Sequence, residues 1–137
     1  MAYWLLKTEP LVYSWEQLLK DKETSWDGVR NYQARNNLRE MKVGDRAYIY
    51  HSGDDKEIRG VVEITREAYP DPSATEGDWV SVGVRAVASV GRAIGLEEIR
   101  NTHGLVVMPL VTQPRLSVQP VTESQWQDLL KYTKTEV

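Results

Sequence analysis

The sequence predicts an α+β fold, a mixed β-barrel of about five or six strands with short flanking helices. The 137 residues are the size of one ordinary domain. Apolar residues make up 41% of the chain and charged residues 27%, which is the balance of a folded protein. Segments that alternate with period two recur at intervals too irregular for repeated βαβ units. We therefore expect residues 1–137 to form a single domain.

The first third of the chain is expected to contain one strand and two helices. Aromatic and aliphatic residues over 2–7 precede Pro10, which is typical of a buried first strand. Ser14 and Gln17 have the spacing of a capping box, so a short helix is expected to begin at Ser14. Apolar residues then recur at helical spacing over 31–41, which predicts a second helix.

From residue 46 onward, the pattern changes to period two. Residues 46–52 and 58–65 alternate on either side of the turn-rich residues 53–56, which predicts a β-hairpin. Residues 79–90 alternate valine with small or polar residues, which favours a long strand, curved or bulged near Gly83.

The last third is expected to be a mixture of short elements. We predict a brief helix over 96–100 and short strands over 105–110 and 115–118. A second capping box begins at Thr122 and predicts a terminal helix over 123–132.

Composition excludes several kinds of chemistry. Without cysteine the chain cannot form a disulfide, a thiolate zinc site, an iron–sulfur cluster or a cysteine nucleophile. Its two histidines, His51 and His103, cannot supply a histidine metal triad. We expect no metal and no cofactor. No stretch approaches the roughly 20 apolar residues that span a bilayer, and no signal-peptide pattern opens the chain, so a cytoplasmic protein without membrane contact is expected.

The net charge of −3 argues against broad, non-specific binding along a phosphate backbone. Any nucleic-acid contact must therefore be local. The segment 30–46 is rich in basic residues, and Arg30, Arg35 and Arg39 are the candidates for backbone contacts. The alternative is that they form a solvated helix face.

The aromatic residues are biased, with five tryptophans, seven tyrosines and no phenylalanine. Trp4, Trp15 and Trp126 occupy positions that core packing explains. Trp26 precedes the polar, glycine-containing sequence DGVRN, which offers no predicted strand or helix to bury it, so it is a candidate ligand platform. Trp79 stands at the head of a strand, where it either lines a barrel mouth or caps the core.

Polar residues at two strand ends are further candidates. Lys7, Thr8 and Glu9 offer donors and acceptors that suit a base edge, although capping and surface ion pairing also explain them. His51 and Ser52 end another predicted strand. A catalytic triad there is disfavoured because neighbouring residues of a strand face opposite ways.

Several motifs together resemble the EVE family, a branch of the PUA-like superfamily related to YTH and ASCH domains. They are WLLKTEP, YSW, WDGVRNYQARN, YHS, YPDP, RLSV and PVTESQW, in order from Tyr3 to about Leu130. The resemblance implies a PUA-like barrel that recognises a modified nucleobase in DNA or RNA. The loop at residues 73–78 is short, so we expect a more open pocket, and the resemblance does not extend to ligand selectivity.

The resemblance also implies roles for individual residues. In YTH domains a methylated base sits in an aromatic cage, and the cage tryptophans fall on motifs similar to those around Trp26 and Trp79. Thr8 and Glu9 would line the floor of the pocket. The expected pocket residues are Lys7, Thr8, Glu9, Trp26, Asp27, Asn31, His51, Ser52 and Trp79. Asp27 and Asn31 would reach polar edges of the base. Contacts with the nucleic-acid backbone would come from Arg30, Arg35 and Arg39.

Three functions remain open on the sequence. The first is a non-catalytic module that binds a modified base, in nucleic acid or as a nucleoside. The second is a small hydrolase of acylated nucleosides, as in some ASCH relatives, in which Lys7 would activate Thr8 as nucleophile with Glu63 or Glu9 as proton carrier. The third is a structural or protein-interaction domain.

Overall fold

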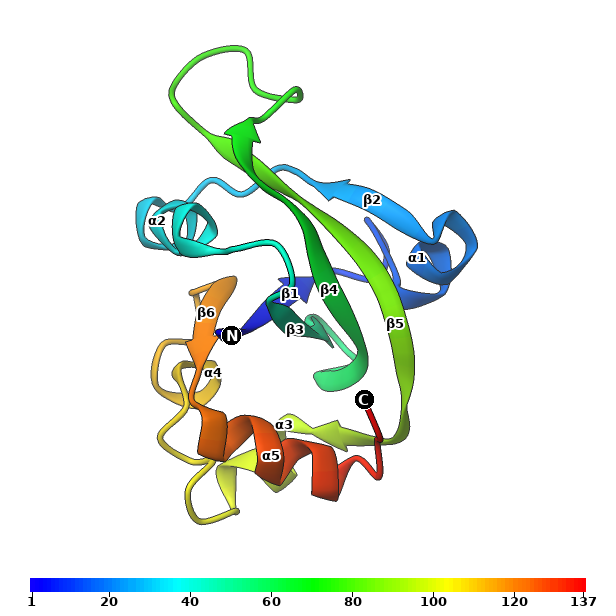
Figure 1. Cartoon of the computed structure of the whole chain (residues 1–137). Coiled ribbons are helices and arrows are strands. Elements are labelled where there is room, and N and C mark those ends of the chain that lie inside the picture. Colours follow the sequence, from blue (N-terminus) through cyan, green and yellow to red (C-terminus); the bar gives the residue numbers. More distant parts are fainter.

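The computed structural model describes residues 1–137 and contains one six-stranded mixed sheet with five short helices (Figure 1). The strands are β1 (Tyr3–Thr8), β2 (Glu23–Trp26), β3 (Arg46–His51), β4 (Glu57–Pro70), β5 (Val80–Gly95) and β6 (Val118–Val121). The helices are α1 (Trp15–Asp21), α2 (Tyr32–Glu40), α3 (Leu96–Arg100), α4 (Pro109–Thr112) and α5 (Glu123–Tyr132). No helix has the length and apolar character needed to cross a membrane.

The strand order is β2-β5-β4-β3-β1-β6. Only β1 and β3 pair in parallel, and all other neighbours are antiparallel. The predicted α+β class is confirmed, as is the hairpin of β3 and β4. The sheet curls strongly along its two longest strands, β4 and β5, but does not close, because β2 and β6 are its two edges (Figure 1).

The curl depends on irregular pairing between β4 and β5. Ile64 pairs with Val84 and Arg66 pairs with Gly83, so Thr65 has no partner across the ladder. A Cβ at Gly83 would lie 2.7 Å from the Thr65 hydroxyl oxygen. The bulge predicted near Gly83 is therefore confirmed, and a glycine is required there for close approach.

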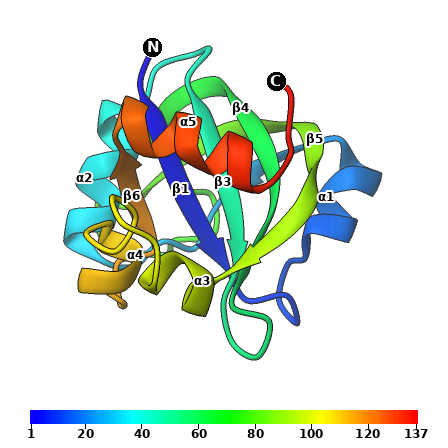
Figure 2. The ribbon, with the colours of Figure 1, turned by 90° about the horizontal axis from the view of Figure 1, so that it is seen from below.

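The sheet separates two hydrophobic cores. Successive residues of β1 point to opposite sides, so Trp4 and Leu6 enter the first core whereas Leu5 enters the second. The first core lies beneath α1 and α2 and includes Leu38. The second core lies beneath α5, which crosses β1 and β3 in Figure 2 and contributes Trp126.

The predicted strand over 105–110 is wrong. The Leu105 amide donates to the Thr102 carbonyl and the Met108 amide to the Leu105 carbonyl, which are turn hydrogen bonds. Pro109 then begins α4, where its missing amide hydrogen costs nothing.

The last predicted strand is displaced. It was expected over 115–118 but forms at Val118–Val121, because the Leu116 amide is bonded to the Gln113 carbonyl in a turn. Pro120 is tolerated there, since β6 is an edge strand.

The short strand β2 was not predicted. Three of its four residues are polar, and only Trp26 is buried, so the segment shows no alternation of apolar residues. Pairing with β5 nevertheless makes it the other edge of the sheet. This edge forms one wall of the candidate site.

Candidate functional site

Trp26 ends β2 and is mostly buried, at 7% exposure. This corrects the expectation that it stands in an unsupported loop: its backbone pairs with Val82 of β5. The Tyr13 ring meets the indole edge-to-face, with centroids 6.3 Å apart and planes at 86°. Trp26 is thus a core residue whose remaining surface faces a cavity.

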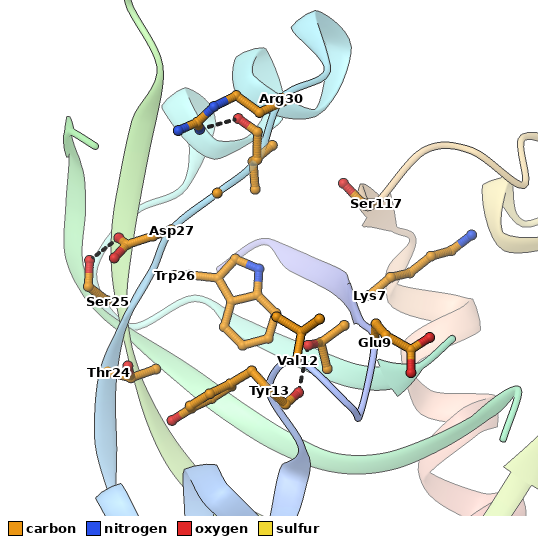
Figure 3. Close-up of a pocket in the computed structure, with 13 residues that line it drawn as sticks. Lys7, Glu9, Val12, Tyr13, Thr24, Ser25, Trp26, Asp27, Arg30 and Ser117 are labelled. Carbon is orange, nitrogen blue, oxygen red and sulfur yellow. Dashed lines mark hydrogen bonds between the residues drawn. The ribbon is translucent and has the colours of Figure 1, made fainter. Parts of the chain in front are cut away.

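The cavity has a volume of about 500 Å³, which is within the usual range for small-molecule sites. It opens between the end of β1, the turn before α1, the end of β2 and residue 117 (Figure 3). Its lining residues are Lys7, Thr8, Glu9, Val12, Tyr13, Thr24, Ser25, Trp26, Asp27, Gly28, Val29, Arg30 and Ser117.

The end of β1 supplies hydrogen-bonding groups to this cavity. The Lys7 ammonium donates to the Pro114 carbonyl at 2.7 Å, and burial lowers the pKa of this lysine. The Thr8 hydroxyl donates to the Tyr13 carbonyl at 2.6 Å. One Glu9 carboxylate oxygen accepts from the Leu11 amide at 3.2 Å. Lys7 has three N–H donors and Glu9 several lone pairs, so both retain capacity for a ligand.

Asp27 occupies the rim. One of its carboxylate oxygens accepts hydrogen bonds from the Ser25 and Ser81 hydroxyls. The Ser25 hydroxyl also contacts the Tyr69 hydroxyl. Figure 3 shows the Asp27 carboxylate turned toward Ser25, so these bonds fix it at the edge of the cavity.

Asp71 supports the wall formed by residues 27–30. Its fully buried carboxylate accepts from the Gly28 amide at 2.8 Å and from the Arg30 guanidinium at 2.9 Å. Burial alone would raise the pKa of Asp71. Hydrogen bonds from Ser73, Arg30 and the Gly28 amide outweigh burial and hold the pKa well below its usual range. The carboxylate stays ionised and ties this wall to the start of the loop after β4.

Five of the nine expected pocket residues line the cavity: Lys7, Thr8, Glu9, Trp26 and Asp27. Arg30 joins them. The other four do not line the cavity. Asn31 is the N-cap of α2, where its side-chain oxygen accepts from the Ala34 amide at 2.9 Å.

His51 is buried and organises the start of α1. Its Nε2 accepts from the Trp15 amide at 2.9 Å, and its Nδ1 lies 3.0 Å from Asp55. Ser52 and Trp79 also lie outside the cavity lining.

Of the residues in the hydrolase hypothesis, Lys7, Thr8 and Glu9 line the same cavity. Glu63 pairs with Arg85 at 2.9 Å and with Arg46 at 3.8 Å, and it does not line the cavity. The Thr8 hydroxyl proton is directed to a backbone carbonyl. No group of three or more His, Asp or Glu side chains is placed to hold a metal ion.

Several lining residues were not expected from the sequence: Val12, Tyr13, Thr24, Ser25, Gly28, Val29 and Ser117. Tyr13 stands in the YSW motif and could have been found there. Ser117 lies at the cavity because the Lys7 amide donates a hydrogen bond to the Ser117 carbonyl. No local pattern could have signalled that contact.

The sequence profile of the EVE domain matches residues 2–132. The chain belongs to the EVE family. Thymocyte nuclear protein 1 of Mus musculus is 40% identical, and the match covers 98% of this chain and 74% of the mouse protein. An uncharacterised protein of Schizosaccharomyces pombe is 31% identical, over 96% and 68% of the two chains.

Solved structures show the same fold. A crystal structure of an Agrobacterium tumefaciens protein superposes with a TM-score of 0.94 at 39% identity, covering 98% of this chain and 94% of that one. Human THYN1 protein, in complex with 5-methylcytosine containing DNA, gives 0.90 at 36% identity, with full coverage of both chains.

A YTH domain has a similar fold. The domain from Zygosaccharomyces rouxii MRB1, in complex with N6-methyladenosine RNA, superposes with a TM-score of 0.62 at 16% identity. The match covers 99% of this chain and 88% of that one. At this identity the likeness concerns the fold alone.

Proposed function

We propose that this EVE domain is a non-catalytic module that binds a modified nucleobase of DNA in the Trp26 cavity. One observation carries the proposal: an indole surface faces a cavity of about 500 Å³ that is also lined by Lys7 and Glu9, two residues with hydrogen-bonding capacity to spare. The human relative, whose structure contains 5-methylcytosine DNA, supports it.

The chemistry of the cavity suits a methylated cytosine. Taking a base out of its stack costs a few kcal/mol, and stacking on an aromatic side chain returns about 1–3 kcal/mol. A carboxylate is the usual acceptor for the exocyclic amine of cytosine, and Glu9 offers one. Lys7 donates to a ring acceptor. Val12 and Val29 supply apolar surface for a methyl group.

Arginines beside the cavity would contact the phosphate backbone of the DNA. Arg30 lines the cavity, while Arg35 and Arg39 lie on α2 and pair with Asp78. Their contacts with phosphates would position the strand without reading its sequence.

Substitution of the carboxylate and the indole tests the proposal. Binding of labelled single-stranded oligonucleotides that carry one 5-methylcytosine, or cytosine, is followed by fluorescence anisotropy. Glu9→Gln is expected to weaken binding of the methylated strand about tenfold. Glu136→Gln makes the same charge change on an exposed residue and should bind normally. Trp26→Leu should lose a similar factor while retaining a cooperative melt.

Equal affinity for methylated and unmethylated strands would contradict the proposal, as would equal affinity of Glu9→Gln and Glu136→Gln. Ribose versions of the same oligonucleotides test RNA as the alternative ligand.

We also propose that the protein is cytoplasmic and that residues 1–137 act as one domain. Because the mouse relative is named a nuclear protein, imaging of a tagged protein tests that location.

A further inference from the structure

An exposed aromatic stack lies beside the cavity but outside it. Tyr32, the first residue of α2, stacks on Trp79, which immediately precedes β5. The ring centroids are 5.1 Å apart and the planes are inclined by 22°. Trp79 is half-buried, whereas Tyr32 is 68% exposed. The tyrosine is therefore the outer member of the pair.

Arg35 flanks this pair without covering the outer face of Tyr32. The Arg35 guanidinium carbon lies 5.0 Å from the Tyr32 centroid and 5.8 Å from the Trp79 centroid. A cation above the outer face of Tyr32 would lie about twice as far from Trp79 as from Tyr32. Arg35 is therefore beside the stack, and the outer tyrosine face is not occupied by this guanidinium.

Arg30 connects the stack to the cavity. Its guanidinium carbon is 5.5 Å from the Trp79 centroid, and the same side chain lines the cavity around Trp26. Only Asn31 separates Arg30 from Tyr32 in the chain. The stack with Tyr32 places Trp79, which follows the loop between β4 and β5, beside the first turn of α2. A nucleic-acid strand leaving the cavity would pass Arg30 and then reach Tyr32.

One exposed aspartate provides the counter-charge for Arg35 and Arg39. Asp78 is 71% exposed at its side chain and pairs with Arg39 at 2.8 Å and Arg35 at 3.3 Å. Hydrogen bonding from Arg39 and the charge of Arg35 lower the pKa of Asp78. An exposed ion pair of this kind is weak, so a phosphate can replace the carboxylate on the two arginines.

We propose that the outer face of Tyr32 stacks on the unpaired base next to the one held in the cavity, so that the site favours single-stranded over duplex DNA. The inference rests on the proposed function. Stacking on an aromatic ring tolerates any base, because every base has a π-face. A neighbour that stays paired in a duplex is held in the helix by its partner strand and by the base stacked on its other side, whereas an unpaired neighbour is free to turn onto Tyr32.

Two probes separate the cavity from this stacking site. The mononucleotide of 5-methyldeoxycytidine reports on the cavity alone, and a single-stranded trinucleotide with that base in the middle reports on both. Each is titrated into ¹⁵N-labelled protein, and affinities follow from amide and indole shifts. Tyr32→Ala should weaken trinucleotide binding about tenfold and leave mononucleotide binding unchanged. Tyr32→Phe keeps the ring and should behave as the wild type.

Two further variants sharpen the result. Tyr132→Ala removes another exposed tyrosine, on α5, and should change neither affinity. Asp78→Asn removes the competing carboxylate and should tighten binding of the trinucleotide but not of the mononucleotide.

The outcomes distinguish the two proposals. If both probes bind and Tyr32→Ala matches Tyr132→Ala, the stacking inference is overturned and the base-binding function stands. Tighter binding of a duplex than of the single strand of the same sequence also overturns the inference. If neither probe shifts the Trp26 indole signal, the proposed function is overturned, and the inference falls with it.

Discussion

At the scale of single residues, one buried carboxylate holds the rim of the cavity in place. Asp71 has no exposed side-chain surface and bonds to the Gly28 amide, to Arg30 and to Ser73. Each bond ends on the segment after β2 or on the loop after β4. The position of Arg30 therefore depends on Asp71, although Asp71 itself does not line the cavity.

Asp71→Asn is expected to lower the free energy of unfolding by about 1–3 kcal/mol at pH 7, because it leaves buried donors with a poorer acceptor. The folded-state pKa of Asp71 lies below its unfolded value. Its stabilising contribution is thus fully present above about pH 4 and is lost as the pH falls through the folded-state pKa.

Denaturant unfolding at a series of pH values measures this effect. The difference between wild type and Asp71→Asn should shrink on acidification. Asp54→Asn, an exposed aspartate, should differ little from the wild type at any pH. If the free energies of unfolding of wild type and Asp71→Asn differ by a constant amount down to strongly acidic pH, the ionised carboxylate is not the source of the stabilisation.

At the scale of elements, the contact between α1 and β4 depends on the absence of a side chain. A Cβ at Gly60 would lie 2.3 Å from the six-membered ring of Trp15. That indole is 2% exposed, and its N–H donates to the Ser89 hydroxyl at 2.8 Å. The ring cannot move away without losing this bond.

Gly60→Ala is therefore expected to destabilise the protein by about 1–3 kcal/mol through overpacking. Gly95→Ala is the control, because its new Cβ would meet its nearest neighbour at an ordinary 3.6 Å. Thermal unfolding of both variants gives the comparison. Equal losses at the two positions would mean that the contact with Trp15 is not the cause.

Elements with strong local signals were predictable from the sequence. The helix after Thr122 has the predicted bounds, and its capping box is complete, since Thr122 and Gln125 each bond the other's amide. The same spacing at Ser14 forms only half a box, because the Gln17 side chain donates to Asp21 instead. Spacing predicts the start of a helix but not which partner a flexible side chain takes.

Elements made by distant pairing were not predictable. The strand β2 exists because four mostly polar residues pair with β5, about 60 positions away in the chain. The same limit applies to the site. Lys7, Thr8 and Glu9 were found because strand ends collect polar groups. Asn31 was misplaced because asparagine is both a good base contact and a good helix cap.

At the scale of the whole molecule, the two cores share one sheet. Leu38 belongs to the first core and Leu129 to the second, and both are fully buried. The backbone of the central strands separates the two cores, and the side chains of these strands enter the two cores alternately. Loss of packing on one side therefore removes support from the strands that carry the other.

This arrangement predicts a single cooperative unfolding transition for residues 1–137. Leu38→Ala and Leu129→Ala should each lower the free energy of unfolding by about 2–5 kcal/mol, because each leaves a cavity in a closed core. In each variant, far-ultraviolet circular dichroism and tryptophan fluorescence should give coincident transitions, since Trp26 lies in one core and Trp126 in the other. If Leu129→Ala instead separates the two signals into two midpoints, the cores are independent, and the proposal of one domain is wrong.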